Sequence, residues 1–383
     1  MTFTETIFLG ITSTGILGLF LIYLGYPLMV LLLPKRNRPS TGQPTPTAAT
    51  LIIPAWREGK GLDQKLENTL ALNTSEIEVQ VIVITDQSKS AELPAHIQWI
   101  TETERLGKAA SLNRAMQQVN TPIVIFSDAN THLNPAAILQ ILRSFTDPSI
   151  GAVAGEKGLM TDRDSGVRSE RIYWNYESAL KKLDARFNSV VGGAGELLAI
   201  RSDYFVPLPP DSLLDDLVIS WEIVKQGHRI AYAPDARALE TPSRNLREEA
   251  TRKIRIAAGG YQFLDRHPLY AIFAISPSYA FQFLFRKWAR WRLAPVLMIL
   301  ALIGNTGLLY VAPTSHVTEF ITSAQVSFYA LAALGFILEA GRVKLGWLAA
   351  PFYFVFMHVC QIRGWLRYRF GHQSVLWERT TRS

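Results

Sequence analysis

Cysteine is almost absent from this chain of 383 residues, because Cys360 is its only example. A single cysteine excludes an intramolecular disulfide and any metal site that needs several thiolates from one chain. Zinc-finger spacing is therefore absent, and no alternation of arginine with aromatic residues indicates binding of RNA or DNA. We expect no nucleic-acid partner, and an active domain that lies in the cytosol.

Charged residues are also scarce, at 19% of the chain against 48% hydrophobic residues. They are missing altogether from residues 7–33, an apolar run longer than the roughly 20 residues needed to cross a bilayer. Lys35, Arg36 and Arg38 follow this run, whereas a signal peptide carries its positive charges before the apolar region. We predict an uncleaved transmembrane helix at 1–34 whose C-terminal end faces the cytosol. The alternative is a buried core helix.

Positive charge gathers ahead of the next apolar segments. Residues 244–292 contain ten Lys or Arg and only three Asp or Glu, and residues 293–311 are strongly apolar. A basic flank beside an apolar span is typical of the cytosolic side of a membrane. We predict a basic interfacial helical segment at 246–292, a transmembrane bundle at 293–366 and a basic tail at 367–383. The protein would then be an integral protein of the cell (inner) membrane.

The number of membrane crossings stays open. Apolar segments at 293–311, 326–338 and 348–362 would place the C-terminus outside if all three crossed the bilayer. A cytosolic C-terminus is favoured instead by the arginines that follow, which are Arg363, Arg367, Arg369, Arg379 and Arg382. Either one segment is re-entrant or interfacial, or residues 268–285 also enter the membrane.

A different pattern begins after a linker rich in Pro, Thr and Ser at 35–49. Short apolar runs then alternate with amphipathic stretches through about residue 245. Strands are predicted at 50–54, 79–85, 123–127 and 150–154, and helices at 58–72, 107–119 and 135–145. This alternation implies a mainly parallel α/β sheet covered on both faces. Ligands bind such sheets at the carboxyl ends of the strands.

Polar residues follow two of these strands directly. Asp86 ends one strand, where a carboxylate accepts hydrogen bonds from a base or ribose, although aspartates are common in loops. Asp128 and Asn130 follow another strand, and their oxygens suit Mg²⁺ or Mn²⁺. Such an ion would neutralise a diphosphate leaving group. An ordinary Asx turn before the next helix explains Asp128 and Asn130 equally well.

A pair of acids, Asp215 and Asp216, opens a predicted helix at 217–225. The structural interpretation is that the pair caps the helix and complements its dipole. The functional interpretation is that one of the two acts as a general base. The helix dipole favours the ionised form of Asp216, which a general base requires.

Two further groups also have alternative explanations. The basic stretch at 252–255 either contacts lipid headgroups or clamps a diphosphate and an acceptor. Tyr173, Trp174 and Tyr176 either stack on sugar rings or belong to the core, since Tyr173 and Tyr176 share one helix face.

Taken in order, these motifs resemble those of the membrane-bound family 2 glycosyltransferases, which include cellulose, chitin and hyaluronan synthases and ceramide glucosyltransferase. The matching stretches are Leu51-Ile52-Ile53-Pro54-Ala55 with Glu58, Thr85-Asp86-Gln87-Ser88, Gly107-Lys108 with Leu112-Asn113, Ser127-Asp128-Ala129-Asn130, Gly192-Gly193-Ala194-Gly195-Glu196 with Arg201, Asp215-Asp216, and Arg252 with Arg255. A terminal Trp-Thr-Arg element of hyaluronan synthases is loosely similar to Trp377, Thr380 and Arg382. The resemblance covers about residues 50–260 and the membrane layout at both ends.

The resemblance implies a GT-A-type, Rossmann-like cytosolic domain at 50–245, joined to α-helical transmembrane segments. It implies an inverting sugar transfer in which Asp216 is the general base, while Asp128 and Asn130 hold Mg²⁺ or Mn²⁺ at the diphosphate. Donor binding is expected from Pro54, Glu58, Asp86, Lys108, Asp128, Arg252 and Arg255. The acceptor side is expected to include Gly193, Glu196 and Asp215.

The expected partners are a nucleotide-sugar donor, with a UDP-sugar favoured, a lipid or glycan acceptor, and the lipid bilayer. Three departures from the family pattern bear on these expectations. Asn130 replaces the second acid of the D-x-D motif, which weakens or alters metal binding. Arg252 and Ile256 replace the Gln and Trp of Q-x-x-R-W, which argues against long processive polymer synthesis. Gln87-Ser88 replaces the more usual Asp-Gly-Ser.

A non-enzymatic alternative is a catalytically inactive family member that acts as a membrane scaffold or polysaccharide-export subunit. An inactive homologue is expected to have lost at least one of Asp86, Asp128 and Asp216, and all three are present. Sugar transfer is therefore the favoured hypothesis.

Overall fold

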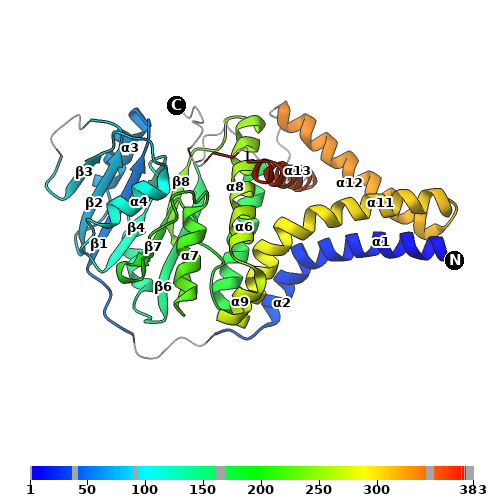
Figure 1. Cartoon of the computed structure of the whole chain (residues 1–383), viewed down its shortest axis with the longest axis horizontal. Helices are drawn as coiled ribbons and strands as arrows, with labels where there is room; N and C mark the ends of the chain where they lie inside the picture. Colours follow the sequence, from blue (N-terminus) through cyan, green and yellow to red (C-terminus); the bar gives the residue numbers. More distant parts are fainter. Residues whose placement is uncertain are drawn as a thin grey trace.

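The computed structural model describes residues 2–36, 42–88, 93–160, 169–341, 349–371, 373, 374 and 376. Figure 1 shows an α/β domain at one end of the molecule and, extending from it side by side, α1 (Phe3–Phe20) and α11 (Ala294–Val311). The Trp377, Thr380 and Arg382 element lies outside the described residues.

Within the described residues, eight strands form one sheet in the order β3-β2-β1-β4-β7-β6-β8-β5. The strands are β1 Ala48–Ala55, β2 Glu78–Thr85, β3 Ile97–Thr101, β4 Ile123–Phe126, β5 Thr131–Leu133, β6 Ile150–Leu159, β7 Leu198–Arg201 and β8 Arg229–Glu240. β1 is parallel to β2 and β4, and β2 is parallel to β3. β7 is antiparallel to both of its neighbours, and β5 is antiparallel to β8. β6 is parallel to β8. The prediction of a mainly parallel sheet is therefore correct for most neighbouring strands, and β7 and β5 are the strands that run in the opposite direction.

The reversed direction of β7 decides where its flanking loop lies. In this antiparallel register Leu198 pairs with Phe126 and Arg201 pairs with Ile123. The residues that precede β7, rather than those that follow it, therefore lie at the carboxyl end of β4. The glycine-rich stretch at 192–195 is placed beside Asp128 in this way.

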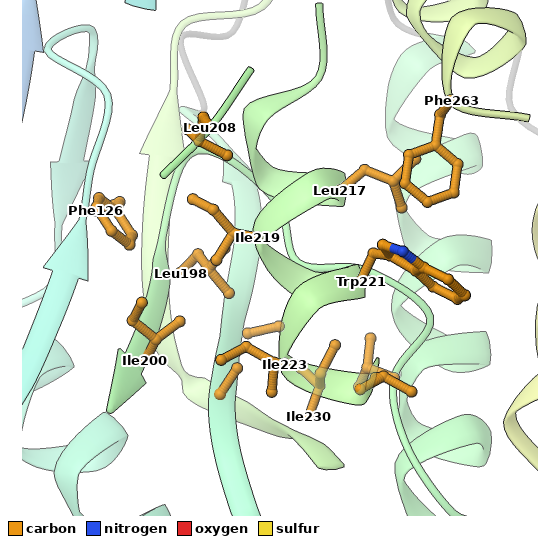
Figure 2. Close-up of a cluster of buried hydrophobic side chains, with 14 of the residues drawn as sticks. Phe126, Leu198, Ile200, Leu208, Leu217, Ile219, Trp221, Ile223, Ile230 and Phe263 are labelled. Carbon is orange, nitrogen blue, oxygen red and sulfur yellow. The ribbon is translucent and has the colours of Figure 1, made fainter. Parts of the chain in front are cut away.

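The helices predicted around the sheet are present, as α3 (Lys60–Leu70), α4 (Lys108–Met116), α5 (Ala137–Ser144) and α7 (Asp215–Lys225). α7 turns one apolar face toward the sheet, where Ile219 and Ile223 pack near Leu198 and Ile200 of β7 (Figure 2). On its other side Trp221 packs against Phe263, with ring centroids 6.0 Å apart. Each such buried side chain stabilises the fold by about 1.5–3 kcal/mol, and this packing holds Asp215 and Asp216 at the start of α7.

Helix α6 (Ser169–Phe187) joins the sheet domain to the hydrophobic helices. Its Glu177 lies 3.0 Å from a guanidinium nitrogen of Arg286 and 2.5 Å from one of Arg290. Its Asp184 is fully buried, accepts a bond of 2.7 Å from Arg286 Nε and also accepts one from the Tyr26 hydroxyl. Paired charges of this kind are sensitive to the loss of either partner. The α/β domain is therefore fixed both to the N-terminal hydrophobic helix, which carries Tyr26, and to the later helical segment that carries Arg286 and Arg290.

The N-terminal hydrophobic helix continues from α1 through a π-helical turn, η1 (Leu21–Gly25), into α2 (Tyr26–Leu32). After a short η2 (Ser202–Tyr204), the C-terminal half contains α8 (Leu246–Arg266), α9 (Leu269–Ile275), α10 (Pro277–Phe283), η3 (Leu284–Leu293), α11, α12 (His316–Ala340) and α13 (Ala349–Arg369). α1 and α11 approach at small residues, because a Cβ on Gly15 would lie 2.6 Å from Ala301 N and one on Gly304 would lie 2.7 Å from Thr12 N.

Three helices among the described residues are long and apolar enough to cross a membrane, namely Phe3–Leu32, Pro277–Val311 and His316–Ala340. The second begins inside the stretch that we expected to be interfacial. α13 is not among the three, although the sequence suggested a membrane segment at 348–362. It instead packs along α8, where a Cβ on Gly364 would lie 2.5 Å from the Cβ of Ala257. The number of membrane crossings and the placement of α13 relative to a bilayer stay predictions.

Candidate active site

Two acids converge on one lysine at the carboxyl edge of the sheet. Lys108, the first residue of α4, donates a 2.7 Å hydrogen bond to Asp128 Oδ1, which follows β4. Its Nζ also lies 3.0 Å from Asp215 Oδ2 at the start of α7. Burial opposes the charge of this lysine, but Asp128 and Asp215 together hold the pKa of Lys108 above its usual value.

The glycine-rich loop approaches this cluster closely. A Cβ on Gly195 would lie 3.3 Å from Lys108 Nζ, 3.6 Å from Asp128 Oδ2 and 4.0 Å from Asp216 Cβ. Gly192 has a φ of +85°, which a residue with a side chain rarely adopts. The Gly193 amide donates a 2.8 Å bond to Ser220 Oγ on α7. The loop therefore needs glycine at residue 192 for its turn, and Gly195 lies in van der Waals reach of the acids.

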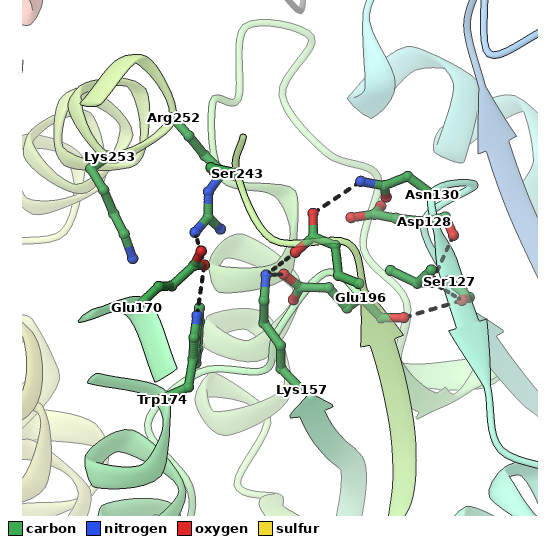
Figure 3. Close-up of polar contacts among 12 residues, drawn as sticks. Ser127, Asp128, Asn130, Lys157, Glu170, Trp174, Glu196, Ser243, Arg252 and Lys253 are labelled. Atoms are coloured by element: carbon green, nitrogen blue, oxygen red, sulfur yellow. Dashed lines mark hydrogen bonds and ion pairs between the residues drawn. The ribbon is translucent and has the colours of Figure 1, made fainter. Parts of the chain in front are cut away.

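Asn130 is held by a carboxylate that the sequence analysis missed. Its Nδ2 donates a 3.0 Å bond to Glu240 Oε1 at the end of β8 (Figure 3). The other oxygen of Glu240 pairs with Lys157 of β6, which also pairs with Glu196. Because a carboxylate can only accept, Asn130 must turn its amide nitrogen to Glu240. The amide oxygen of Asn130 is then the atom left for a cation.

Asp216 has a strongly raised pKa. Burial, and then the neighbouring Asp215, raise the pKa of Asp216 to about 7. We expected the helix dipole to keep this carboxyl easily ionised, and that expectation is wrong because desolvation and like charge outweigh the dipole. A pKa near neutrality suits a general base, which must be ionised and still hold a proton well.

A buried lysine supports the turn that carries Asp128. Lys65 of α3 is fully buried and donates bonds of 2.7 Å to Ser127 Oγ and 2.9 Å to the Thr131 carbonyl. Burial lowers the pKa of Lys65 to about 7, although nearby Asp128 acts in the opposite direction. These bonds fix both ends of the segment from Ser127 to Thr131.

A cavity of about 640 Å³ encloses most of the predicted site residues. Its lining includes Lys108, Asp128, Asn130, Gly193, Glu196, Asp215, Asp216, Arg252 and Arg255. Pro54, Glu58 and Asp86 are not part of this lining. Pro54 is the penultimate residue of β1, and Asp86 follows β2 and accepts a 2.9 Å bond from the Arg57 amide. The carboxyl ends of these two parallel strands lie next to that of β4, beside the cavity.

The basic motif on α8 has structural partners as well as a place in the cavity. Arg252 pairs with Glu170 of α6 and lies 3.0 Å from Glu249 Oε2. Glu249 is fully buried, and its pKa is lowered to about 2 because Arg252 and Lys253 outweigh the effect of its burial. The diphosphate role of Arg252 stays a prediction, as does that of Arg255.

The aromatic residues of α6 line the cavity and also pack in the interior. The Lys253 ammonium lies 4.3 Å from the Tyr173 ring centroid and 5.2 Å from that of Trp174. Tyr176 donates a 2.6 Å bond to the Tyr23 carbonyl. Both sequence interpretations, ligand stacking and core packing, are therefore compatible with where these residues lie.

Sequence reasoning missed Lys65, Lys157 and Glu240, which support the site without matching a short motif. Lys157 and Glu240 lie 83 residues apart in the chain, and Asn130 and Glu240 lie 110 apart. The sequence signal for Lys157 and Glu240 is a charged residue inside a strand, and Lys65 lies on helix α3 without such a signal. Such a residue is unusual in a buried strand unless it has a partner.

The cavity, the strand-end acids and the glycine-rich loop agree with a comparison against protein families. The model described as "Glycosyltransferase like family 2" matches residues 46–259. The chain belongs to this family. The family 2 resemblance inferred from the motifs is thereby confirmed.

Curated relatives of this glycosyltransferase are distant and longer. The poly-beta-1,6-N-acetyl-D-glucosamine synthase of Staphylococcus aureus is 24% identical over 228 residues, which cover 57% of this chain and 55% of the relative. An N-acetylglucosaminyltransferase of Bradyrhizobium diazoefficiens is 21% identical over 239 residues, covering 56% of this chain and 49% of that protein. The chain thus spans about half the length of the curated relatives it matches.

A solved structure confirms the fold of the glycosyltransferase over almost its whole length. The mannosyltransferase PcManGT from Pyrobaculum calidifontis, in complex with GDP-Man and Mn²⁺, superposes with a TM-score of 0.70 at 19% identity. The match covers 97% of this chain and 100% of that chain. The protein is therefore an enzyme of glycosyltransferase type with a GT-A fold and added helices that can span a membrane.

Proposed function

We propose that this enzyme transfers a sugar from a nucleotide-sugar donor to an acceptor hydroxyl, with inversion at the anomeric carbon and Asp216 as the general base. The observation that carries the proposal is the common cavity shared by Asp216, Asp128 and Lys108. Asp216 removes the proton of the acceptor hydroxyl, and that oxygen forms the new bond to the anomeric carbon. The bond from that carbon to the diphosphate breaks, and the nucleoside diphosphate leaves with the electron pair.

The remaining residues have separate tasks in this proposal. Lys108 and Arg255 neutralise the diphosphate, and Asp86, beside the cavity, accepts bonds from the nucleoside. Cations that stabilise charge as it develops contribute strongly in a site shielded from water. Asp215 orients Lys108, to which it is already paired at 3.0 Å.

The site also fits a divalent cation. Asp128 offers a carboxylate inside the cavity, and Asn130 offers its amide oxygen because its nitrogen is bonded to Glu240. In the described residues no cluster of three or more His, Cys, Asp or Glu forms a complete protein cage, and Mg²⁺ commonly needs only one or two side chains plus substrate phosphates. Asp128 and Asn130 would hold the ion. When bound, it would supply positive charge to the diphosphate.

Ligand binding gives a direct test of the donor class. Because a ligand that binds the folded state stabilises it, a donor raises the melting temperature. We expect a UDP-sugar to give the largest shift among UDP-, GDP- and dTDP-sugars, and Mn²⁺ to increase it. The test is a thermal-shift screen of the purified protein with and without Mn²⁺ and EDTA. If no nucleotide sugar shifts the melting temperature under any of these conditions, the proposed donor site is wrong.

The proposed location is the inner membrane, with the catalytic domain in the cytosol. In a Cys360→Ala background, Ser75→Cys places a thiol on an exposed turn of the α/β domain, and Thr314→Cys places one on the turn between α11 and α12. We expect an impermeant maleimide to label Thr314→Cys in intact cells and to label Ser75→Cys only after lysis. The reverse pattern would place the catalytic domain outside.

A further inference from the structure

The active-site cavity continues from the acids to the hydrophobic helices. Its far end is lined by Tyr23 and Leu24 of η1 and by Ala350, Phe354 and Met357 of α13. Tyr23 and Leu24 belong to the Phe3–Leu32 helix, which is long and apolar enough to cross a membrane. One cavity therefore reaches from Asp216 to a helix that contacts the bilayer.

The cavity is open to an apolar surface at this far end. The side chain of Leu24 is 55% exposed even though it lines the cavity, and Leu21 and Leu28 on the same helix are exposed as well. Exposed leucines on a membrane-crossing helix face hydrocarbon. Leu24 therefore marks a place where the cavity meets the bilayer.

Helix α13 forms the other side of this opening. It is attached to η1, since the Tyr23 and Phe354 rings lie 5.0 Å apart and Tyr23 Oη lies 3.2 Å from His358 Nε2. Its outer surface exposes the apolar Val359 and Trp365. Its last turn carries Arg367 and Arg369, and long basic side chains at a helix end favour the headgroup region. The opening is then at the level of the lipid headgroups.

The described helices do not enclose a path for a polymer across the bilayer. α1 and α11 touch backbone to backbone at Gly15 and Gly304. α12 is attached to α11 through Asn305 Nδ2, which donates a 2.6 Å bond to Gln325 Oε1. Among the three candidate spans in the described part of the chain, α11 is thus in direct contact with both α1 and α12, and this close packing does not favour a water-filled pore between them. A polymer acceptor that crosses the bilayer between these helices is therefore disfavoured.

We propose that the acceptor is a membrane lipid with a hydroxyl-bearing headgroup, which enters sideways between η1 and α13. The proposal rests on the proposed sugar transfer and names its acceptor class. The hydrocarbon tail stays in the bilayer beside Leu24, while the headgroup passes Phe354 and Met357 and presents its hydroxyl to Asp216. Tyr173 and Trp174 flank this path, as amphipathic rings commonly do at a membrane–water interface.

The test uses the full-length enzyme in phosphatidylcholine nanodiscs, a radiolabelled nucleotide sugar that the thermal-shift screen identifies, and a total lipid extract of the source membranes as the acceptor probe. We expect the labelled sugar to appear in the organic-solvent phase. Leu24→Trp and Met357→Trp narrow the opening, and they should reduce lipid labelling by at least about tenfold, since a misplacement of about 1 Å costs up to about 10²-fold. Slow hydrolysis of the donor by water should be unchanged.

Leu28→Trp is the matched control, because Leu28 is 54% exposed on the same hydrophobic helix and does not line the cavity. It should leave lipid labelling unchanged. Label found only in water-soluble product, or equal effects of Leu24→Trp and Leu28→Trp, would overturn the lipid proposal while donor turnover still supports sugar transfer. Absence of both donor hydrolysis and transfer would instead contradict the proposed function itself.

Discussion

Asp216→Asn should lower kcat by at least about 100-fold and leave donor affinity within a few-fold, because a general base typically contributes about 10²–10⁴-fold. Asparagine keeps the shape of the side chain and cannot take a proton. The measurement is steady-state turnover together with calorimetric donor binding on the same preparation. Unchanged melting temperature and donor binding are required first, since unfolding would imitate loss of catalysis.

Asp215→Asn is the matched control, because it removes the same charge one residue away. The loss of kcat in Asp215→Asn should be smaller, since Lys108 keeps its 2.7 Å bond to Asp128.

With the pKa of Asp216 at about 7, kcat of the unaltered enzyme should fall by roughly tenfold per pH unit below that value, as the base becomes protonated. The residual turnover of Asp216→Asn should lack this fall. Near-normal turnover of Asp216→Asn, or a larger loss of turnover in Asp215→Asn, would contradict the assignment of Asp216 as the general base.

Asn130→Asp should weaken metal binding, although it restores the acidic D-x-D pattern of the family. The new carboxylate would face Glu240 Oε1, to which Asn130 now donates at 3.0 Å. Two carboxylates at this distance repel or share a proton, and Lys157 is already divided between Glu196 and Glu240. We expect Mn²⁺ affinity, measured by electron paramagnetic resonance with the nucleoside diphosphate present, to fall about 10–100-fold, as for other changes to groups that orient metal ligands.

Glu240→Gln provides the rescue for this variant. In Asn130→Asp/Glu240→Gln the glutamine amide can donate to the new carboxylate, so Mn²⁺ affinity should recover to within a few-fold of the unaltered protein. A double-mutant cycle separates this coupling from general damage, since independent changes would simply add. Additive losses, or tighter Mn²⁺ binding in Asn130→Asp alone, would show that Glu240 does not orient residue 130.

The first half of the α/β domain, which contains β1, β2 and β4, could be predicted well from the sequence, because its sequence signals are local. β1, β2 and β4 consist mostly of apolar residues, and Asp86 and Asp128 closely follow two of them. Asp216 and the glycine-rich loop were found by their motifs, and the cavity brings most of the predicted residues together. The ionisation of Asp216 was not predicted, since it depends on burial by segments distant in the chain.

The second half of the sheet and the packing of α13 could not be predicted from local sequence signals. β7 has only four residues, and its antiparallel direction follows from the route of the chain through α6. α13 begins as an apolar stretch like a membrane span, and only its packing of Gly364 against α8 shows where it lies. The same applies to Glu240, whose importance comes from contacts made across the sheet.

The buried pairs between α6 and η3 make the catalytic domain and its hydrophobic helices a single folding unit. Asp184 is fully buried and bonded to Tyr26 of α2 and Arg286 of η3, which lie 260 residues apart in the chain. Cutting away the hydrophobic helices would strip this buried carboxylate of both partners and leave an unpaired charge in α6. In the proposed membrane arrangement, these buried pairs hold Asp216 at a fixed height above the bilayer. In the proposed reaction, Asp216 would therefore reach only acceptor hydroxyls that lie at one particular distance from the membrane.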